Sequence, residues 1–273
     1  MSPDRLSETY HPAGSELPLA RHGEKKDNLL VVSPHPDDDV LGAGGTMALA
    51  SEKGQNVFAV YVTDGRGSPR KNLRITDEET AARRQQEALS SLRTIGGAGG
   101  FFLRRQSREL TGRNGIEVRE EIREILERLR PAEIYLPAPY ERHRTHQACT
   151  ALTIDALRAA GEWPLKVFGY GLWGTFWGGK ERVARDVGAV IRRKVEAVAA
   201  HASQIEYKDY HQGILGKNNY EAVFWESHEV QKASFLEIFV EMTEFVKRKD
   251  LSIRTFIQED VAEFMKDYLP IPE

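Results

Sequence analysis

Residues 28–46 read NLLVVSPHPDDDVLGAGGT and contain the pattern that most constrains the architecture. The apolar run 28–33 ends in a proline-rich acidic loop, and glycines follow at the start of the next segment. A short apolar run that is bounded by turn residues is typical of a buried strand. In α/β sheets, ligands bind beyond the carboxyl ends of the strands. We therefore expect functional residues in the loop that begins at Ser33.

The alternation of strand and helix continues along the 273 residues of the chain. Hydrophobic periodicity predicts strands at 28–33, 57–63, 101–103, 133–136 and 166–172, and helices at 43–53, 76–95, 116–129, 143–160 and 182–200. Thr76 and Glu79 have the spacing of a capping box. After about residue 205 the pattern weakens: 235–246 fits a strand or a helix, and 255–268 is predicted to be helical. The prediction is a single α/β domain, Rossmann-like, with a mainly parallel sheet and helices on both faces.

Composition excludes several classes of protein. Cys149 is the single cysteine, so an internal disulfide and a multi-cysteine zinc site are excluded, and metal ligands must come mainly from eight His and 41 Asp and Glu. A net charge of −3 gives no overall positive field, so we expect no nucleic-acid partner. No apolar run approaches the roughly 20 residues of a membrane span, so we expect no membrane contact and a cytoplasmic location. We expect residues 1–27 to form a partly ordered N-terminal arm and residues 28–273 to form the domain.

Two pairs of candidate metal ligands each follow a predicted strand. His35 and Asp38 are three residues apart, and the three carboxylates 37–39 would repel one another unless a cation relieved the repulsion. The alternative interpretation of the carboxylates is a solvated acidic turn that caps the next helix. His143 and His146 begin a predicted helix and share one of its faces. Two histidines and one aspartate around an open position are a catalytic zinc pattern, so a joint metal site is predicted.

The glycines in 42–46 allow one rival interpretation. Gly42-Ala43-Gly44 begins like a dinucleotide-binding fingerprint, but Met47 stands at the final glycine position. The acidic loop also lies where a pyrophosphate would have to bind. The glycines are better explained by close packing of the helix against the sheet.

Several motifs together resemble one known family. His35-Pro36-Asp37-Asp38, Gly44-Gly45-Thr46 and His143-x-x-His146 resemble the LmbE-like (PIG-L) family of zinc-dependent N-deacetylases. Further matches are Thr63-Asp64-Gly65, Arg84-x-x-Glu87 and the stretch from Lys194 to His201-Ala202-Ser203-Gln204. The resemblance covers residues 28–204. Within the family, residues 34–38 and 143–146 look most similar to the diacetylchitobiose deacetylase branch.

The resemblance implies a set of roles. His35, Asp38 and His146 would hold zinc, Asp37 would be the general base, and His143 would stabilise the oxyanion or assist as an acid. The implied substrate is an N-acetylglucosamine-type sugar or glycoconjugate, which would yield acetate and a sugar amine. One departure stands out, because many members have Asp between the two histidines and this chain has Thr145.

Other assignments stay open at this stage. Arg66 in the basic loop 64–76, and Trp173 and Trp177 among glycines, are candidates for substrate contact, although a solvated loop and a surface loop pinned to the core explain them equally well. His201 is interpreted as structural rather than as a group beside the metal. The alternative functions are a magnesium-dependent phosphate-ester hydrolase that uses carboxylates 37–39, and a non-catalytic sugar- or nucleotide-binding module. Similar deacetylases often form oligomers, so we expect a homo-oligomer.

Overall fold

In the part of the chain that the structure describes, the sheet has seven strands, of which five run parallel. The computed structural model describes residues 27–69, 74–110, 112–173, 182–225 and 232–250. The strand order is β3-β2-β1-β4-β5-β7-β6. The parallel strands are β1 (Asn28–Ser33), β2 (Asn56–Thr63), β3 (Gly99–Arg105), β4 (Glu133–Pro137) and β5 (Lys166–Tyr170). β7 (Leu236–Glu241) pairs antiparallel with β5, and β6 (Arg182–Asp186) pairs antiparallel with β7. The predicted α/β class and mainly parallel sheet are confirmed.

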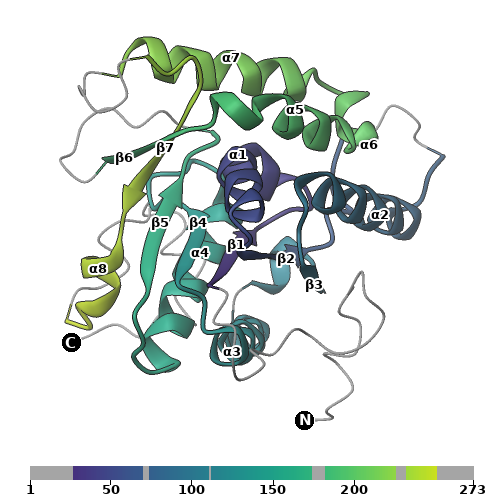
Figure 1. Ribbon diagram of the computed structural model, residues 1–273. Helices are drawn as coiled ribbons and strands as arrows, with labels where there is room; N and C mark the ends of the chain where they lie inside the picture. The colour runs from purple at the N-terminus through teal and green to yellow at the C-terminus, as the bar shows by residue number, and fades with distance from the viewer. Residues whose placement is uncertain (1–26, 70–73, 111, 174–181, 226–231, 251–273) are drawn as a thin grey trace.

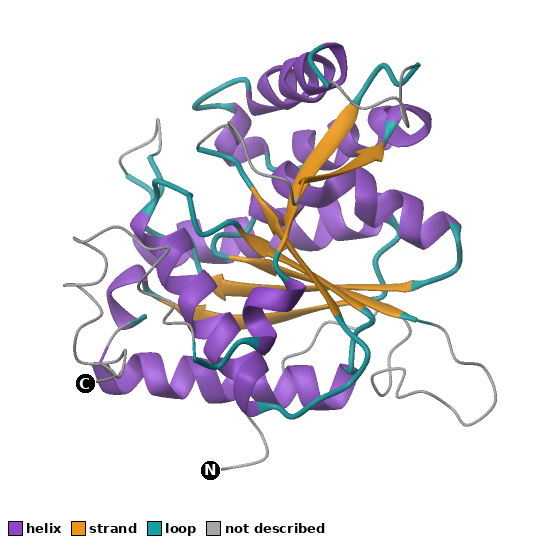
Figure 2. Ribbon diagram, turned by 90° about the vertical axis from the view of Figure 1, so that its left-hand side faces the viewer, coloured by secondary structure: helices purple, strands orange, loops and turns teal. Residues whose placement is uncertain are grey.

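Helices cover both faces of this sheet (Figures 1 and 2). The described helices are α1 (Asp38–Glu52), α2 (Asp77–Ile95), α3 (Gly112–Leu129), α4 (Arg144–Ala159), α5 (Ile191–Ala199), α6 (Ala202–Ile205), α7 (Tyr210–Val223) and α8 (Thr243–Lys247). Alternate residues of β1 enter two different cores, because side chains of a strand alternate between the faces of the sheet. Leu30 and Val32 pack with α3 and α4, whereas Leu29 and Val31 pack with α1, α2 and α5. No helix among the described residues is long and apolar enough to cross a membrane.

Short sequence motifs predicted where α2 begins. α2 has the predicted capping box: Thr76 Oγ1 accepts from the Glu79 amide at 3.1 Å, and the Thr76 amide donates to Glu79 Oε2 at 2.8 Å. α2 ends at Gly96, whose φ of 83° lies in the left-handed region that favours glycine. The segment 235–246, which fitted either class, is β7 followed by α8.

The prediction of one helix over 182–200 is wrong. Residues 182–186 form β6, a short 3-10 turn follows at Gly188–Val190, and only α5 is α-helical. The strand forms because the free edge of β7 offers backbone partners, from Arg182 opposite Val240 to Asp186 opposite Leu236. Pairing with a distant strand overrides local periodicity. α7 was not predicted. The predicted helix 255–268 and the predicted arm 1–27, apart from Asp27, lie outside the described residues.

A buried polar network fixes the bend in α1. The backbone leaves helical geometry at Ala43, where φ is −136° and ψ is 15°, so the next turn of α1 begins with amides that lack a partner in the helix. Glu237 of β7 supplies the acceptors: it accepts from the amides of Gly45 and Thr46 at 2.7 and 2.8 Å, and from Thr46 Oγ1 at 2.7 Å. Lys194 of α5 donates to Glu237 Oε1 at 2.7 Å and to Asn218 of α7 at 2.9 Å. The network ties α1, α5 and α7 to β7.

Candidate metal centre

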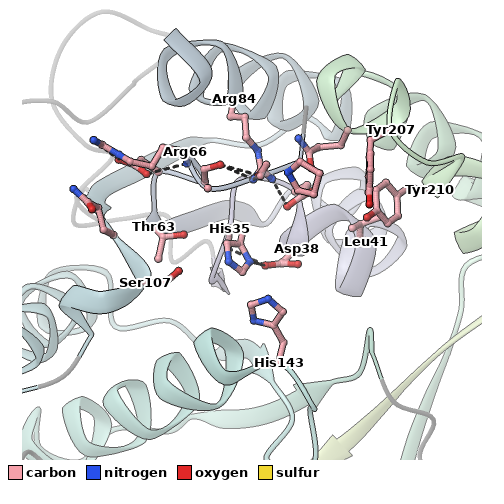
Figure 3. A pocket seen from close by; sticks show the side chains of 18 of the residues that line it. His35, Asp38, Leu41, Thr63, Arg66, Arg84, Ser107, His143, Tyr207 and Tyr210 are labelled. Carbon is pink, nitrogen blue, oxygen red and sulfur yellow. Dashed lines mark hydrogen bonds and ion pairs between the residues drawn. The ribbon is translucent and has the colours of Figure 1, made fainter. Parts of the chain in front are cut away.

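The loops that follow β1 and β4 meet at one edge of the sheet. β1 and β4 are neighbours in the sheet, with Leu29 opposite Glu133. From this pair, β2 and β3 follow β1 on one side and β5 follows β4 on the other, so the order of the strands changes direction between β1 and β4. Such a switch point opens a crevice beyond the carboxyl ends of the strands. A cavity of about 640 Å³ lies there. Figure 3 shows His35, Asp38 and His143 pointing toward one another in this cavity.

The structure brings His35, Asp38 and His146 together. His35 Nδ1 lies 2.9 Å from Asp38 Oδ2, and His146 Nε2 lies 3.1 Å from the same oxygen. One candidate ligand atom from each residue lies within 4.8 Å of the others. His146 is fully buried, and its Nε2 has no hydrogen-bond partner of acceptable geometry. A buried polar atom without a hydrogen bond is costly, so its direction toward Asp38 fits a cation between them. Two imidazole nitrogens and one carboxylate suit zinc better than magnesium.

The loop after β1 forms a tight turn that gathers its carboxylates. The amides of Asp37 and Asp38 donate to the His35 carbonyl at 2.8 and 3.3 Å, and the His35 amide donates to Asp38 Oδ2 at 2.8 Å. Asp39 points away from the cavity and accepts from Tyr61 Oη at 2.8 Å. Burial raises the pKa of Asp39 to about 7. All three carboxylates are buried, so the alternative of a solvated acidic turn is wrong.

Charge complementarity holds the central carboxylate ionised. Burial opposes the charge of Asp38, but His146 and His35 beside it outweigh burial and hold its pKa well below the usual range. Burial likewise opposes the charge of His146, but Asp38 and Glu141 raise its pKa to about 9. Without a metal, the pair therefore favours a proton on His146, which a cation would replace.

Asp37 and His143 flank these three residues. Asp37 is buried, and its Oδ1 lies 2.7 Å from Nη2 of Arg84, a fully buried side chain on α2. Burial raises the pKa of Asp37, while Arg84 opposes that shift. The ring centroid of His143 lies 5.0 Å from that of His35 and 4.8 Å from that of His146. Desolvation and the neighbouring histidines lower the pKa of His143 to about 4.

The guanidinium of Arg84 explains a glycine in the loop after β2. Arg84 donates to the Gly65 carbonyl at 3.3 Å and to Ser68 Oγ. Gly65 has a φ of 67°, and a Cβ there would lie 2.3 Å from Arg84 Nη1. Only glycine fits both the backbone conformation and the close approach. Gly65 and Arg84, which belong to two of the motifs, therefore form one support for Asp37.

The predicted substrate contacts have different surroundings. Arg66 lines the cavity but pairs with Asp64 at 2.7 Å and with Glu78 at 3.0 Å. Trp173 also lines the cavity; it is 46% exposed, and its ring lies 6.5 Å from that of His143. Trp177 lies outside the described residues. Tyr207 and Tyr210 add aromatic surface to the cavity that sequence analysis missed, because they lie after residue 205, where the periodicity weakens.

Glu141 is a further residue that sequence analysis missed. It is buried, and its Oε2 lies 3.0 Å from His146 Nδ1. The signal in the sequence is an acidic residue five positions before His146 in the same loop, outside the motifs that carry the family resemblance. His201, interpreted as structural, is buried with neither ring nitrogen hydrogen-bonded; burial lowers its pKa to about 3, and Arg84 contributes.

Comparisons with known proteins agree with the motifs. The family model described as "PIG-L: GlcNAc-PI de-N-acetylase" matches residues 30–157. The diacetylchitobiose deacetylase of Thermococcus kodakarensis is 29% identical over 191 residues, which cover 64% of this chain and 69% of the relative. The structure of N,N'-diacetylchitobiose deacetylase from Pyrococcus horikoshii is similar with a TM-score of 0.68 at 23% identity, covering 82% of this chain and 87% of that one.

One structural neighbour has another activity, so the fold alone does not identify the reaction. GalB, a 4-carboxy-2-hydroxymuconate hydratase from Pseudomonas putida, has a TM-score of 0.66 at 17% identity, covering 79% of this chain and 95% of that one. The shared fold therefore does not select a reaction. The residues in the cavity must carry that argument.

Proposed function

The chain carries a PIG-L (LmbE-like) domain, and from that premise we propose that it removes the acetyl group from an N-acetylglucosamine-type sugar or glycoconjugate in a zinc-dependent reaction. The convergence of His35, Asp38 and His146 inside the matched segment is the observation that supports this proposal. Deacetylation of an amide requires a nucleophile, a base and an electrophile around one carbonyl. The cavity offers side chains suited to each.

We assign the metal to His35, Asp38 and His146. When bound, zinc supplies a polarised carbonyl and a water of lowered pKa. His35 and Asp38 line the cavity, so this side of the cluster faces the space from which the acetyl group can approach. The cavity volume of about 640 Å³ is within the range of roughly 300–1,000 Å³ that is typical of small-molecule sites.

Asp37 serves as the general base in this proposal. Its carboxylate takes a proton from the attacking water and returns it to the amine nitrogen as the carbon–nitrogen bond breaks. The ion pair with Arg84 fixes the orientation of the carboxylate and opposes its protonation. His143 stabilises the negative charge that develops on the acetyl oxygen, because it lies at the cavity beside His35 and His146.

The walls of the cavity would bind the sugar. Trp173 and Tyr210 meet edge to face, with centroids 6.5 Å apart, and present aromatic surface on which a sugar ring can stack. Arg66 can donate to sugar hydroxyls while its ion pairs with Asp64 and Glu78 hold it in place. We propose Trp173 and Arg66 as substrate contacts, because both line the cavity.

An acetate-release assay tests the proposal. Protein loaded with one equivalent of zinc is incubated with N-acetylglucosamine, diacetylchitobiose and a phosphate ester, and acetate, free amine and phosphate are measured. We expect acetate and amine in equal amounts, loss of both after chelation, and a decrease of about 10²–10⁴-fold in kcat for Asp37→Asn. Phosphate release with magnesium would support the alternative hydrolase, and binding of sugars without turnover would support the binding module; either result contradicts the proposal.

Two further expectations concern the oligomeric state of the protein and its location in the cell. A homo-oligomer is tested by the molar mass in solution, and a mass near 30.8 kDa would contradict it. The cytoplasmic location remains a prediction that localisation of a tagged chain would test.

A further inference from the structure

Glu141 lies directly behind His146, on the side away from the cavity. Its carboxylate is 1% exposed and touches three partners. Oε2 lies 3.0 Å from His146 Nδ1, while Oε1 accepts from the amides of Leu172 and Trp173 at 2.7 and 3.0 Å. A backbone bond from the Glu141 amide to the Ala138 carbonyl, at 3.1 Å, and a bond from Gln147 Nε2 to the Glu141 carbonyl hold the loop itself.

This arrangement determines which nitrogen of His146 carries the proton. A carboxylate can only accept hydrogen bonds, so His146 Nδ1 must donate to Glu141. In the neutral ring, Nε2 is then left with a lone pair. That lone pair faces Asp38 Oδ2 at 3.1 Å, where the candidate metal position lies. Carboxylates that orient histidine ligands in this way also increase the basicity of the ligand.

Thr145 does not provide this support. Its side chain is buried on α4, and no hydrogen bond joins it to either histidine of the motif in the described part of the chain. Glu141, from the loop before α4, therefore gives His146 an acidic partner in this chain, which has Thr at position 145.

The same carboxylate also holds the backbone beside the cavity residue Trp173. Leu172 and Trp173 follow β5, and their two amides converge on Glu141. This fixes the backbone that carries Trp173, whose ring lines the cavity near His143. We propose that Glu141 is a positioning residue that sets the tautomer of His146 for metal binding and anchors Trp173 at the cavity wall.

Replacement by glutamine tests the tautomer directly. An amide has one acceptor oxygen, so in Glu141→Gln it either accepts from the backbone amides and donates to His146 Nδ1, or it loses both backbone bonds. The first arrangement moves the imidazole proton to Nε2, which blocks the metal position. We expect zinc affinity, measured by competition with a chromophoric chelator, to fall about 10–100-fold. Glu133→Gln is the matched control. Glu133 lies at the start of β4, at the other end of the strand from the metal site, and it accepts a hydrogen bond from Tyr135 Oη. The zinc affinity of this variant should equal that of the wild type.

A measurement on the unaltered chain keeps the inference testable if Glu141→Gln does not fold. Nitrogen-15 NMR of the imidazoles reports which nitrogen of His146 carries a proton, and in the zinc-bound chain we expect a proton on Nδ1 and none on Nε2. In that zinc-bound chain, a proton on Nε2 with Nδ1 unprotonated would overturn the inference, as would wild-type zinc affinity in folded Glu141→Gln. The inference rests on the proposed metal site, but the failures are distinguishable: a chain that binds zinc and releases no acetate contradicts only the function.

A second readout concerns Trp173. In folded Glu141→Gln we expect KM for the sugar to rise in addition to the loss of zinc affinity, because the backbone under Trp173 loses an acceptor. At saturating zinc, an unchanged KM would contradict the anchoring role. Thr145→Asp in the wild-type background should leave zinc affinity unchanged.

Discussion

Glu237→Gln should destabilise the chain strongly, although the two side chains have nearly the same shape. Glu237 is 1% exposed and accepts four hydrogen bonds, from two amides and a hydroxyl of α1 and from Lys194. Glutamine can accept on one atom only, so its amino group would face donors. The ammonium of Lys194, which is fully buried, would keep Asn218 Oδ1 as its polar partner.

The magnitude follows from two limits. Removal of one partner of a buried ion pair costs about 3–5 kcal/mol. The chain can escape part of that cost by deprotonating Lys194, and burial already lowers the pKa of this lysine. Deprotonation of a lysine with an ordinary pKa costs about 5 kcal/mol at pH 7, so it sets an upper bound. We expect a loss of about 4 kcal/mol, a large part of the roughly 5–15 kcal/mol by which native proteins are stable.

Urea unfolding at pH 7.5, followed by far-ultraviolet circular dichroism, measures this loss. The matched variants are Lys194→Met and the double variant. Lys194→Met leaves Glu237 with three donors of α1, so it should cost less than Glu237→Gln. The double variant contains no unpaired ammonium, so it should be more stable than the sum of the single losses predicts. A loss below about 1 kcal/mol in Glu237→Gln, or strict additivity, would refute the reasoning, because buried pairs couple by more than that.

Three other predictions concern the site and its surroundings. Arg84→Gln should lower kcat for acetate release about 10²-fold with a smaller change in zinc affinity, because Asp37 loses its orienting partner; equal kcat values would contradict the role of Arg84. The pKa of His201 is lowered to about 3 in the folded chain, so the unfolded chain binds one more proton below its ordinary pKa of 6.5, and stability falls as pH decreases through that value. Between pH 7.5 and 5.5 this single group should account for about 1.4 kcal/mol, and His201→Gln should reduce the fall measured by urea unfolding by that amount. In a sample whose free zinc concentration is 100 times Kd, removal of the zinc should lower the free energy of unfolding by about 2.7 kcal/mol. A thermal melt should then show a Tm lower by about 5–10 °C, and an unchanged Tm would contradict a bound metal.

Local signals predicted much of this chain. β1 and the loop after it could be identified because an apolar run, prolines and charges change within a few residues. α2 could be located by its capping box, which needs only Thr76 and Glu79. His35, Asp38 and His146 could be grouped because two short motifs each follow a strand, and parallel strands end at one edge.

The rest depends on contacts between distant parts of the chain. Glu237 reaches Gly45 across 192 positions, and no local pattern relates them. Glu141 could be noticed as a nearby acid, but its bonds to Leu172 and Trp173 require β5 to end beside its loop. β6 could not be predicted because it is a strand only through its pairing with β7.

The position of β7 between β5 and β6 has a consequence for synthesis of the chain. A ribosome releases 182–186 before it releases 236–241, yet those later residues are the strand with which β6 pairs. Until they emerge, 182–186 has no strand to join, and its own periodicity favours helix. We expect this edge of the sheet to form last, with a segment that changes from helix to strand when its partner arrives. A nascent chain stalled before residue 236 would carry that segment in its earlier form.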